Sequence, residues 1–567
     1  KSGSELPLFD CFKSPCNAND VGCPIEQQIP EYLKLVSEGK YKEAFDIISI
    51  DNSSPAITGT ICDHQCQAAC TRVDYEEPLS IRDVKKVAVL AAQDNFIKET
   101  KVMELKTSKK VAVIGAGVGG TAAALFLRRN GVEVDVFEKR DKPMGIVSIV
   151  IPEFRIASQM IEKDYKLALA AGVNFHFNVD ADFDVNELKK DYDFVVIAIG
   201  SWLKGYNPLK TGKELALEAL DFLEKSKASD LSLDLGKNVV IIGGGDVSMD
   251  CARSAKRTAG VENVTLLYRR VRKVMPATTE EINLAMGDGV VIKFLTSPVD
   301  FDGKTLTCVK NELVNNKAQS TNETFTMECD TIINAIGTKV DKSSYERNNM
   351  LLNEWGYPEI NNKNETSLEN VYVAGDGKAG AKTIVKAIAD AKLISIDILN
   401  KLGLENDFIR ITILENQDRL YEKKGILEEK IEAKLDGLRC LACDQVCDVC
   451  SDVCPNRANL SIYVNSDLFD QDQQILHVDG MCNECGNCGT FCPHGGLPYK
   501  DKITLFWTEH DFVDSTNVGF LPLSENTFKV RDEAGKIFTY TIGEQTVSKE
   551  LEAIINVVVN EHSYLMS

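Results

Sequence analysis

The stretch "KKVAVIGAGVGGTAAALFLRRNGVEVDVFEK", residues 109–139, decides the fold of the largest part of the chain. An apolar strand, a glycine-rich turn, a helix and a second strand follow in the order of a parallel β–α–β unit. Gly115 permits the tight turn, Gly117 lets a pyrophosphate approach the backbone, and Gly120 lets helix and strand pack closely. Glu138, at the end of the second strand, is placed to accept hydrogen bonds from a ribose. The stretch therefore predicts a dinucleotide-binding domain, with the pyrophosphate at the positive end of the helix.

A second unit of the same kind recurs at "KNVVIIGGGDVSMDCARSAKRTAGVENVTLLYRR". Its turn carries Gly243, Gly245 and Ser248; serine in place of the third glycine costs some closeness of packing but does not block a phosphate. The strand that follows ends in Arg269 and Arg270, where a domain that chooses NAD normally has an acid. Guanidinium groups suit a 2′-phosphate, so we predict NADP(H); NAD(H) with a solvated basic edge is the alternative.

The second unit is inserted within the first, which is the pattern of flavoproteins with two dinucleotide-binding domains. "DFVVIAIG" and "DTIINAIG" read as short buried strands that end in glycine, and "VYVAGDGKAGAKTIVKAIADA" completes the first domain. Asp376 would meet the ribityl chain of FAD, and the helix that starts near Thr383 would point its N-terminus at the flavin ring. The other cofactor-binding residues that we expect are Lys139, Gly145, Gly200, Gly337 and Asp246.

The chain has 18 cysteines, and they are bunched. Cys251, Cys308 and Cys329 are scattered and are interpreted as core thiols. The others lie before residue 71 or between residues 440 and 492. Bunching of this kind beside two nucleotide-binding fingerprints indicates metal ligation instead of a secreted disulfide framework.

The C-terminal cysteines form two runs of the bacterial ferredoxin type. In "MCNECGNCGTFCP" and "CLACDQVCDVCSDVCP", three thiolates of a run would hold one cubane cluster and the fourth would serve its neighbour. Zinc is the weaker interpretation, because zinc sites usually take cysteines in separated pairs. We assign one [4Fe–4S] cluster to Cys443, Cys447, Cys450 and Cys492, and the other to Cys482, Cys485, Cys488 and Cys454. Cys440 is left over; it could replace Cys443, but we favour a spare thiol.

The N-terminal cysteines lie in "CFKSPCNANDVGCP" and "ICDHQCQAACTR", and they are Cys11, Cys16, Cys23, Cys62, Cys66 and Cys70. Taken alone they fit a disulfide frame, a zinc knuckle, an iron–sulfur site or buried thiols. His64 is the one histidine near them, and we interpret it as a solvated loop residue, with ligation as the alternative.

Residues 1 to about 400 resemble the glutamate synthase small-subunit family, which includes the NADPH–ferredoxin transhydrogenase large subunit and the front half of dihydropyrimidine dehydrogenase. The motifs that carry the resemblance are "GCPIEQQIP", "ICDHQCQAACTR", "IPEFRI", "GGGDVSMDCAR", "YRRVRKVMPAT" and "AGD". One departure is "DKPMGIVSIVIPEFRI", where the family has a glycine pair and here only Gly145 follows Met144. That loop would lie near the flavin.

The resemblance implies two N-terminal cubane clusters, one on Cys11, Cys16 and Cys70 and the other on Cys23, Cys62 and Cys66. The family's first cysteine falls on Leu8 here, and its Glu or Gln ligand falls on Lys85. Either Glu76, Glu77 or Asp10 completes the ligand sets, or only one N-terminal cluster forms. An iron content of about 12 per chain would indicate one cluster, and about 16 would indicate two.

With its ferredoxin module, almost the whole chain resembles iron–sulfur flavoprotein subunits named for selenate reductase, which accompany molybdenum hydroxylases in anaerobic bacteria. In dihydropyrimidine dehydrogenase a barrel domain with FMN separates the two parts, so we do not expect pyrimidine reduction here. The fold class that we predict is α/β, with two Rossmann-like domains and iron–sulfur domains at both ends. We expect a helical iron–sulfur domain (1–105), an FAD-binding domain (106–205 and 330–400), an inserted NAD(P)-binding domain (206–329), a linking helix (401–436), a ferredoxin-like domain (437–500) and a strand-rich appendage that ends in a helix (501–567).

Composition limits the partners. The net charge of −21 argues against nucleic acid or an anionic membrane as the main partner. No apolar run is long enough to span a bilayer and no signal peptide is visible, so we expect a cytoplasmic protein. A hetero-oligomer with a partner oxidoreductase subunit or a ferredoxin is the expected assembly.

Three functions fit the sequence. The first is an NAD(P)H-dependent oxidoreductase in which hydride passes between nicotinamide and flavin and single electrons pass through the clusters to or from a partner, such as a molybdenum hydroxylase or a selenate reductase. The second is a bifurcating or transhydrogenating subunit that uses ferredoxin. The third is a redox-inactive scaffold, which the intact glycines and arginines disfavour. We expect no acid–base catalytic residue, because hydride transfer needs orientation only.

Overall fold

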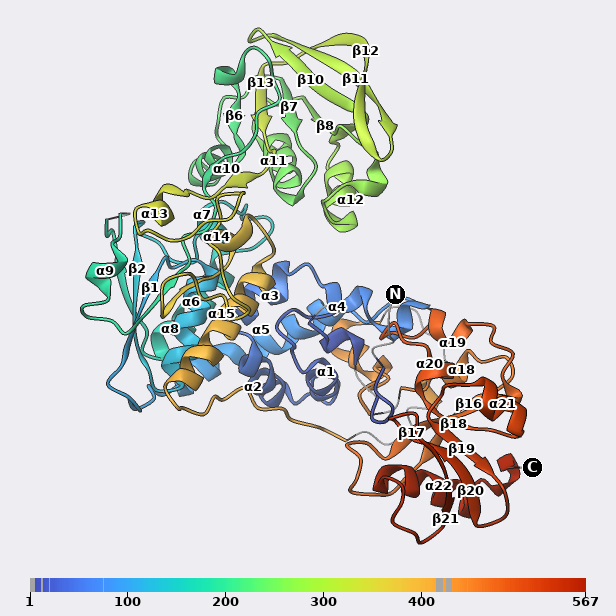
Figure 1. Cartoon of the computed structure of the whole chain (residues 1–567). Helices are drawn as coiled ribbons and strands as arrows, with labels where there is room; N and C mark the ends of the chain where they lie inside the picture. Colours follow the sequence, from blue (N-terminus) through green and yellow to red (C-terminus); the bar gives the residue numbers. More distant parts are fainter. Residues whose placement is uncertain are drawn as a thin grey trace. The chain divides into compact units, whose positions relative to one another are not determined.

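The chain forms two compact units in a computed structural model (Figure 1). The model describes residues 6–11, 14–19, 21–74, 76–180, 182–414, 422–424, 431–445 and 447–566. The dinucleotide unit comprises Tyr41–Asp63 and Lys85–Ile409, and the cysteine unit comprises Lys1–Lys40, His64–Val84 and Arg410–Ser567. The segment 1–105, for which we expected one helical domain, is therefore shared between the two units.

The first sheet of the dinucleotide unit has the strand order β15–β4–β1–β2–β3, and every neighbouring pair is parallel. The strands are β1 (Lys110–Ile114), β2 (Glu133–Glu138), β3 (Asn174–Phe177), β4 (Phe194–Ile197) and β15 (Val371–Val373). The central strands are apolar runs because both faces of a parallel sheet are covered. α6 (Val118–Arg129) follows β1 and packs against α15 (Ile384–Lys401).

The second sheet is inserted between β4 and β15 and has the order β6–β13–β7–β8–β9, again with parallel pairs only. Its strands are β6 (Leu217–Glu218), β7 (Asn238–Ile242), β8 (Asn263–Leu267), β9 (Val291–Lys293) and β13 (Thr331–Asn334). Its helices are α10 (Ala219–Ala228), α11 (Asp246–Arg257) and α12 (Thr279–Gly287). An antiparallel meander is added by β10 (Thr296–Phe301), β11 (Thr305–Val314) and β12 (Lys317–Glu328).

The chain leaves and re-enters the first domain side by side. β5 (Leu203–Lys204) leads out and pairs antiparallel with β14 (Thr338–Lys339), which leads back. The nested order confirms the predicted α/β fold class, with one dinucleotide-binding fold inserted in another.

The N-terminal stretches that we expected to be helical are helices. α1 (Ile29–Ser37) belongs to the cysteine unit, α2 (Tyr41–Asp51) and α3 (Pro55–Ile61) belong to the dinucleotide unit, and α5 (Ile81–Glu99) begins in the former and continues in the latter. Buried Asp164, on α8 (Ser158–Ala170), accepts hydrogen bonds from the backbone N–H groups of Ala56 (3.0 Å) and Ile57 (2.8 Å). This carboxylate therefore satisfies buried N–H donors at the start of α3 that have no partner within the helix, and it fixes that helix on the dinucleotide unit.

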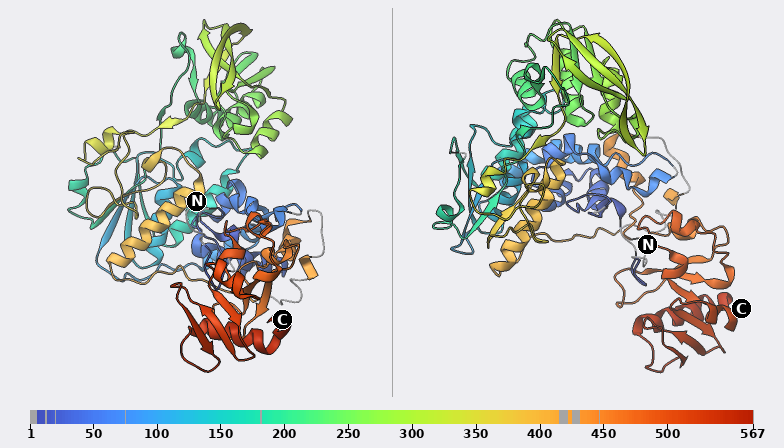
Figure 2. Two further views of the ribbon diagram at one scale, coloured as in Figure 1. Left: turned by 45° about the vertical axis from the view of Figure 1, so that its right-hand side comes forward. Right: turned by 45° about the horizontal axis from the view of Figure 1, so that its top comes forward.

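The C-terminal strands of the cysteine unit form one six-stranded sheet in the order β16 to β21 (Figure 2). They are β16 (Asn459–Tyr463), β17 (Gln473–Val478), β18 (Ile503–Leu505), β19 (Gly519–Pro522), β20 (Thr527–Arg531) and β21 (Ile537–Thr541), and α22 (Lys549–Glu561) follows. The boundary that we expected at residue 500 falls between β17 and β18, which are adjacent parallel strands of this sheet. The appendage is strand-rich and ends in a helix, as expected, but it continues the sheet of the preceding module.

Two further expectations concern the linker and the membrane. α15 ends at Lys401 and α17 spans Ala433–Asp436, while residues 415–421 and 425–430 of the predicted linking helix lie outside the described residues. Within the described ranges, none of the helices combines the length and the apolar character that crossing a bilayer requires.

Candidate functional site

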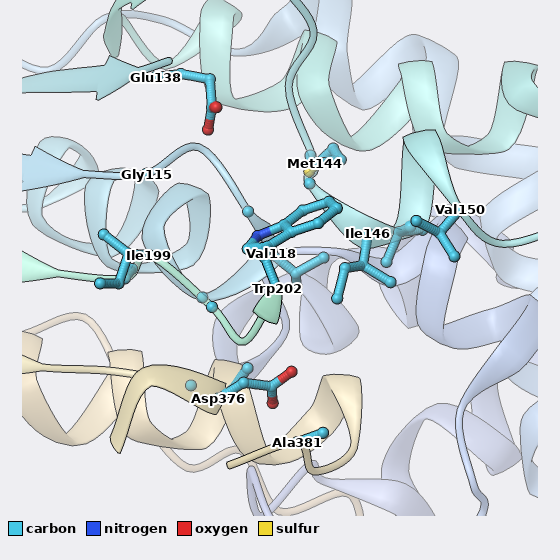
Figure 3. Close-up of a pocket in the computed structure, with 18 of the residues that line it drawn as sticks. Gly115, Val118, Glu138, Met144, Ile146, Val150, Ile199, Trp202, Asp376 and Ala381 are labelled. Carbon is cyan, nitrogen blue, oxygen red and sulfur yellow. The ribbon is translucent and has the colours of Figure 1, made fainter. Parts of the chain in front are cut away.

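A cavity of about 780 Å³ lies in the dinucleotide unit and is lined from both dinucleotide turns. The first turn supplies Gly115 and Gly117, the second supplies Asp246 and Val247, and Asp376 comes from the segment after β15. Figure 3 shows Glu138, Trp202 and Asp376 among the side chains that line it. The volume lies in the range of cofactor sites, and the cavity brings predicted flavin-site residues together with Asp246 of the second turn. The other predicted nicotinamide residues, Gly243, Gly245, Ser248, Arg269 and Arg270, do not line it.

The first turn has the geometry that a pyrophosphate needs. A Cβ at Gly120 would lie 2.0 Å from the carbonyl oxygen of Gly115, so this glycine is required by helix–strand packing. No described heavy atom lies within 4 Å of a Cβ built at Gly117, which lines the cavity at the N-terminus of α6. The space beside Gly117 is therefore left open by the protein, as expected where a phosphate approaches the backbone.

Glu138 is buried at the end of β2 and lines the cavity. Its carboxylate accepts hydrogen bonds from the backbone N–H groups of Ala116 (2.8 Å) and Arg140 (2.9 Å). A carboxylate has about four acceptor positions, so two remain for the hydroxyl groups of a ribose.

The second turn repeats this arrangement with one substitution. Ser248 is buried, and its hydroxyl donates to the carbonyl of Ala335 at 3.3 Å, which holds α11 against β13. No described heavy atom lies within 4 Å of a Cβ built at Gly245. Arg269 is exposed at the end of β8, and Arg270 donates from Nε to the Tyr268 hydroxyl at 3.1 Å.

The remaining predicted residues lie at or next to the cavity. Asp376 accepts a hydrogen bond from the Lys382 N–H at 2.9 Å, and its pKa is raised by burial and by the nearby charge of Asp390. Thr383 caps the N-terminus of α15 and lines the cavity together with Ile384, so the start of this helix lies at the cavity wall. Lys139, Gly145, Gly200 and Asp246 also line the cavity, whereas Gly337 is the neighbour of the lining residue Thr338.

The loop that departs from the family carries an unusual backbone. Met144 is fully buried, lines the cavity and has φ +68°, a region that favours glycine. Its N–H donates to the carbonyl of Ala116 at 2.7 Å, which holds the loop against the first turn. The family's first glycine of the pair is thus explained by this conformation, which methionine adopts here at a cost of about 1–2 kcal/mol.

Sequence reasoning missed two residues of the site. Trp202 lines the cavity, and the Arg140 guanidinium lies 4.5 Å from the centre of its ring. Arg140 also forms an ion pair with Glu224 of α10 at 2.6 Å, which ties the first domain to the inserted one. The signal was available: Trp202 follows directly after a glycine-terminated strand, and Arg140 follows the acid of the first fingerprint.

The thiols of the cysteine unit form groups. Cys454 and Cys488 lie close enough to Cys482 for their charges to interact. Backbone N–H groups donate to the sulfurs of Cys454 (from Ala458, 3.2 Å) and Cys482 (from Glu484, 3.3 Å). A second group packs Cys447, Cys450 and Cys488 together, with Cys11 and Cys443 against them. N–H groups directed at sulfur favour thiolates and stabilise anionic clusters, so these donor sets fit [4Fe–4S] clusters.

Two further observations bear on the metal sites. In the part of the chain that the structure describes, no three His, Cys, Asp or Glu side chains converge on the position of a single metal ion. A cubane is larger than one ion and holds its thiolates further apart. In the dinucleotide unit the Lys85 ammonium, at the family's carboxylate or amide position, donates to the Cys62 sulfur at 3.8 Å.

Comparisons with known proteins decide the family. A model described as pyridine nucleotide-disulphide oxidoreductase matches residues 109–391, and one described as dihydropyrimidine dehydrogenase domain II, 4Fe-4S cluster, matches residues 8–97. The chain is 32% identical to the glutamate synthase [NADPH] small chain of Azospirillum brasilense, over 66% of this chain and 83% of that protein. The chain belongs to the glutamate synthase small-chain family. These matches confirm the predicted FAD- and NAD(P)-binding region and the predicted [4Fe–4S] region.

Other members of this wider group extend the match. The oxidoreductase YgfK of Escherichia coli O157:H7 is 40% identical over 91% of this chain and 51% of its own length, so the chain spans about half of that relative. The NADP(+)-dependent formate dehydrogenase subunit beta of Moorella thermoacetica is 30% identical over 74% of this chain and 64% of its own length. Two of the relatives are thus named as a small chain or a subunit of an enzyme.

Proposed function

We propose that the chain passes electrons between NADPH, FAD and a series of [4Fe–4S] clusters, to or from a partner oxidoreductase. The observation that carries the proposal is the single cavity lined by both dinucleotide turns. A nicotinamide bound at the second turn and a flavin bound at the first would meet in that space. When bound, FAD supplies the exchange between the paired electrons of a nicotinamide and the single electrons of iron–sulfur clusters.

The residues of this chain would bind FAD and the nicotinamide nucleotide and orient them towards each other. The open space at Gly117 and the start of α6 would take the FAD pyrophosphate, Glu138 the ribose, and Asp376 the ribityl hydroxyls. The open space at Gly245 would take the pyrophosphate of the nicotinamide nucleotide. The apolar residues of the cavity wall, among them Met144, exclude water from the reacting atoms.

Arg269 and Arg270 support NADP(H) over NAD(H). Arg269 is exposed at the end of β8, and Arg270 is held beside it by its bond to Tyr268. A 2′-phosphate would meet two guanidinium groups there, and each charged hydrogen bond contributes about 1.5–3 kcal/mol.

The partner in this proposal is a larger enzyme that exchanges single electrons with the clusters. The relatives named small chain and subunit beta support assembly with a larger enzyme, and the thiol groups of the cysteine unit would lead electrons towards it. A molybdenum hydroxylase or a selenate reductase remains our candidate for that partner.

The test separates nicotinamide binding from flavin binding. Val at Gly245 would fill the open space of the second turn, so Gly245→Val should retain FAD and its bleaching by dithionite but lose rapid bleaching by NADPH. Rapid NADPH bleaching in this variant would contradict the assignment of the second turn.

A further inference from the structure

The first described residues of the chain lie on the C-terminal sheet of the same unit. The Asp10 N–H donates to the side-chain oxygen of Gln474 on β17 at 3.0 Å, and the Gln474 amide donates back to the Asp10 carboxylate at 2.8 Å. The Gln471 N–H donates to the same carboxylate at 3.2 Å, and the ring of Phe9 lies 5.3 Å from that of Phe469. Residue 11 therefore starts from a fixed position beside β17.

Leu8 shows why this segment departs from the family. The family's first cluster cysteine falls on Leu8, and in this chain Leu8 packs with Phe9 against the apolar core of the C-terminal sheet. The Lys502 ammonium donates to the Leu8 carbonyl at 3.4 Å. The position that carries a cluster ligand in the family therefore carries an apolar core residue, Leu8, in this chain. The packing of Leu8 holds the next cysteine, Cys11, near the ferredoxin runs.

Cys11 reaches the second thiol group. Together with Cys443, it packs against the buried set that contains Cys447, Cys450 and Cys488. Cys11 thus lies beside Cys447 and Cys450, two cysteines that the sequence pattern grouped without it.

The loop around Cys70, from the N-terminal part of the chain, lies against the C-terminal segment that carries Cys440. The Arg72 Nε donates to the carbonyl of Arg439 at 2.6 Å, so the backbone that precedes Cys440 lies against the loop that follows Cys70. The Arg439 guanidinium, itself buried, donates to the Glu77 carbonyl at 2.6 Å. Thr71 also shares a hydrogen bond with the Cys443 sulfur at 3.2 Å.

Cys16 completes this group. The 3₁₀ turn that carries it, Pro15–Asn17, packs against α4 (Gln65–Ala68). α4 carries Cys66 and ends two residues before Cys70, so Cys16 lies beside the loop that carries Cys70.

We infer that two clusters of this chain exchange ligands between its ends: Cys16, Cys70, Cys440 and Cys443 hold one [4Fe–4S] cluster, and Cys11, Cys447, Cys450 and Cys492 hold the next. Cys440 is then a ligand and not a spare thiol, and the ligand that this chain lacks at Leu8 is supplied from the C-terminal region. Cys443, expected beside Cys447 in one cluster, instead joins the neighbouring one.

The surroundings favour this arrangement. Arg72 and Arg439 are 2% exposed and lie beside the loop that carries Cys70, where their positive charges would favour the negative charge of a thiolate-ligated cluster. Cys443 and Cys447 belong to one short segment of the chain, so the two clusters would follow one another along it. Electrons would then have a continuous path within the cysteine unit.

Iron content in paired alanine variants tests the ligand sets. The inference uses the proposed function only in taking these thiols as cluster ligands, and dithionite replaces NADPH as the reductant, so a failure of NADPH oxidation does not affect the result. Two cysteines of one cluster should lose about four irons per FAD, singly or together, whereas two cysteines of different clusters should lose about eight together. Cys251→Ala, which removes a buried thiol of the dinucleotide unit, is the control and should lose none.

The inference predicts about four irons lost in Cys11→Ala/Cys450→Ala and in Cys16→Ala/Cys440→Ala, and about eight in Cys11→Ala/Cys16→Ala. The family grouping instead predicts about eight irons lost in Cys11→Ala/Cys450→Ala and about four in Cys11→Ala/Cys16→Ala, and that result would overturn the inference. Full iron content in Cys440→Ala would also overturn it. Serine variants serve if alanine variants do not fold, because serine retains an oxygen donor. Cys11→Ser should then shift the same electron paramagnetic resonance signal as Cys450→Ser; a shift of the signal altered by Cys16→Ser would contradict the inference.

Discussion

Arg155 joins the two dinucleotide-binding domains, and its removal gives the sharpest prediction on the fold. Its guanidinium lies 2.9 Å from Asp250 on α11 and 3.0 Å from Glu281 on α12. Arg253 supports Glu281 at 3.0 Å. The side chains of Arg155 and Asp250 are 14% and 5% exposed, so water contributes little to either charge.

Arg155→Met leaves the Asp250 carboxylate buried without its cation. Breaking a buried pair costs about 3–5 kcal/mol, and the residual exposure of Arg155 places this case near 3 kcal/mol. Burial already raises the pKa of Asp250 to about 7, against the opposing effect of Arg155, so the variant should raise it further. Between about pH 4 and its raised pKa, Asp250 is protonated in the folded variant and ionised in the unfolded chain. The loss of unfolding free energy relative to the parent should therefore be largest above pH 7 and shrink as the pH falls.

The assay is thermal unfolding of the FAD-loaded protein at pH 8 and pH 6, together with the rate of flavin bleaching by NADPH. We expect a melting temperature about 5 °C lower at pH 8 and a smaller difference at pH 6. Arg347→Met is the matched control, because its pair with Asp182 at 2.6 Å is exposed and contributes at most about 1 kcal/mol. Equal melting temperatures of Arg155→Met and the parent at pH 8 would refute the reasoning.

Three further predictions follow from single positions. Burial lowers the pKa of His477 from 6.5 to about 4. Its contribution to the free energy of unfolding is therefore present above pH 6.5 and is lost as the pH falls towards 4. His477→Gln should remove about 3 kcal/mol of that pH dependence, measured by urea unfolding of variant and parent. An unchanged acid dependence would show that other groups control it. Arg269→Glu should lower kcat/KM for NADPH by about 10- to 100-fold and leave NADH unaffected or improved, whereas equal losses with both nucleotides would place the 2′-phosphate elsewhere. Gly117→Ala should fold normally, because its Cβ meets open space, but it should lose FAD, because that space is the proposed phosphate position. Gly120→Ala should destabilise the domain, because its Cβ would lie 2.0 Å from a carbonyl oxygen. Full FAD content in Gly117→Ala would contradict the assigned phosphate position.

The two dinucleotide folds were predictable because their signals are local. Glycines at fixed intervals after an apolar strand report on one turn, so the positions of Gly117 and Gly245 beside open space followed from the sequence. The signal for Trp202 was weaker: the residue lies shortly after Gly200, but its contact with Arg140 joins residues that are distant along the chain, and no local pattern reports that contact.

The grouping of the thiols shows the limit of spacing arguments. The ferredoxin runs predicted which cysteines lie near one another within a run, as Cys482 and Cys488 do. Spacing could not reveal that the hydrogen bonds of Asp10 with Gln474 carry Cys11 to a distant run, nor that Arg72 holds Arg439, and with it Cys440, beside Cys70. These contacts join segments separated by more than half of the chain, and one sequence contains no local trace of them.

The central claim is that electrons pass from NADPH through the flavin to the clusters, and rapid anaerobic mixing with NADPH tests it most directly. Flavin absorbance and freeze-quenched electron paramagnetic resonance would be followed in the same reaction. The account predicts that the flavin bleaches first and that reduced-cluster signals appear afterwards, faster with NADPH than with NADH. Absence of bleaching with either nucleotide in protein that contains FAD and iron would contradict it.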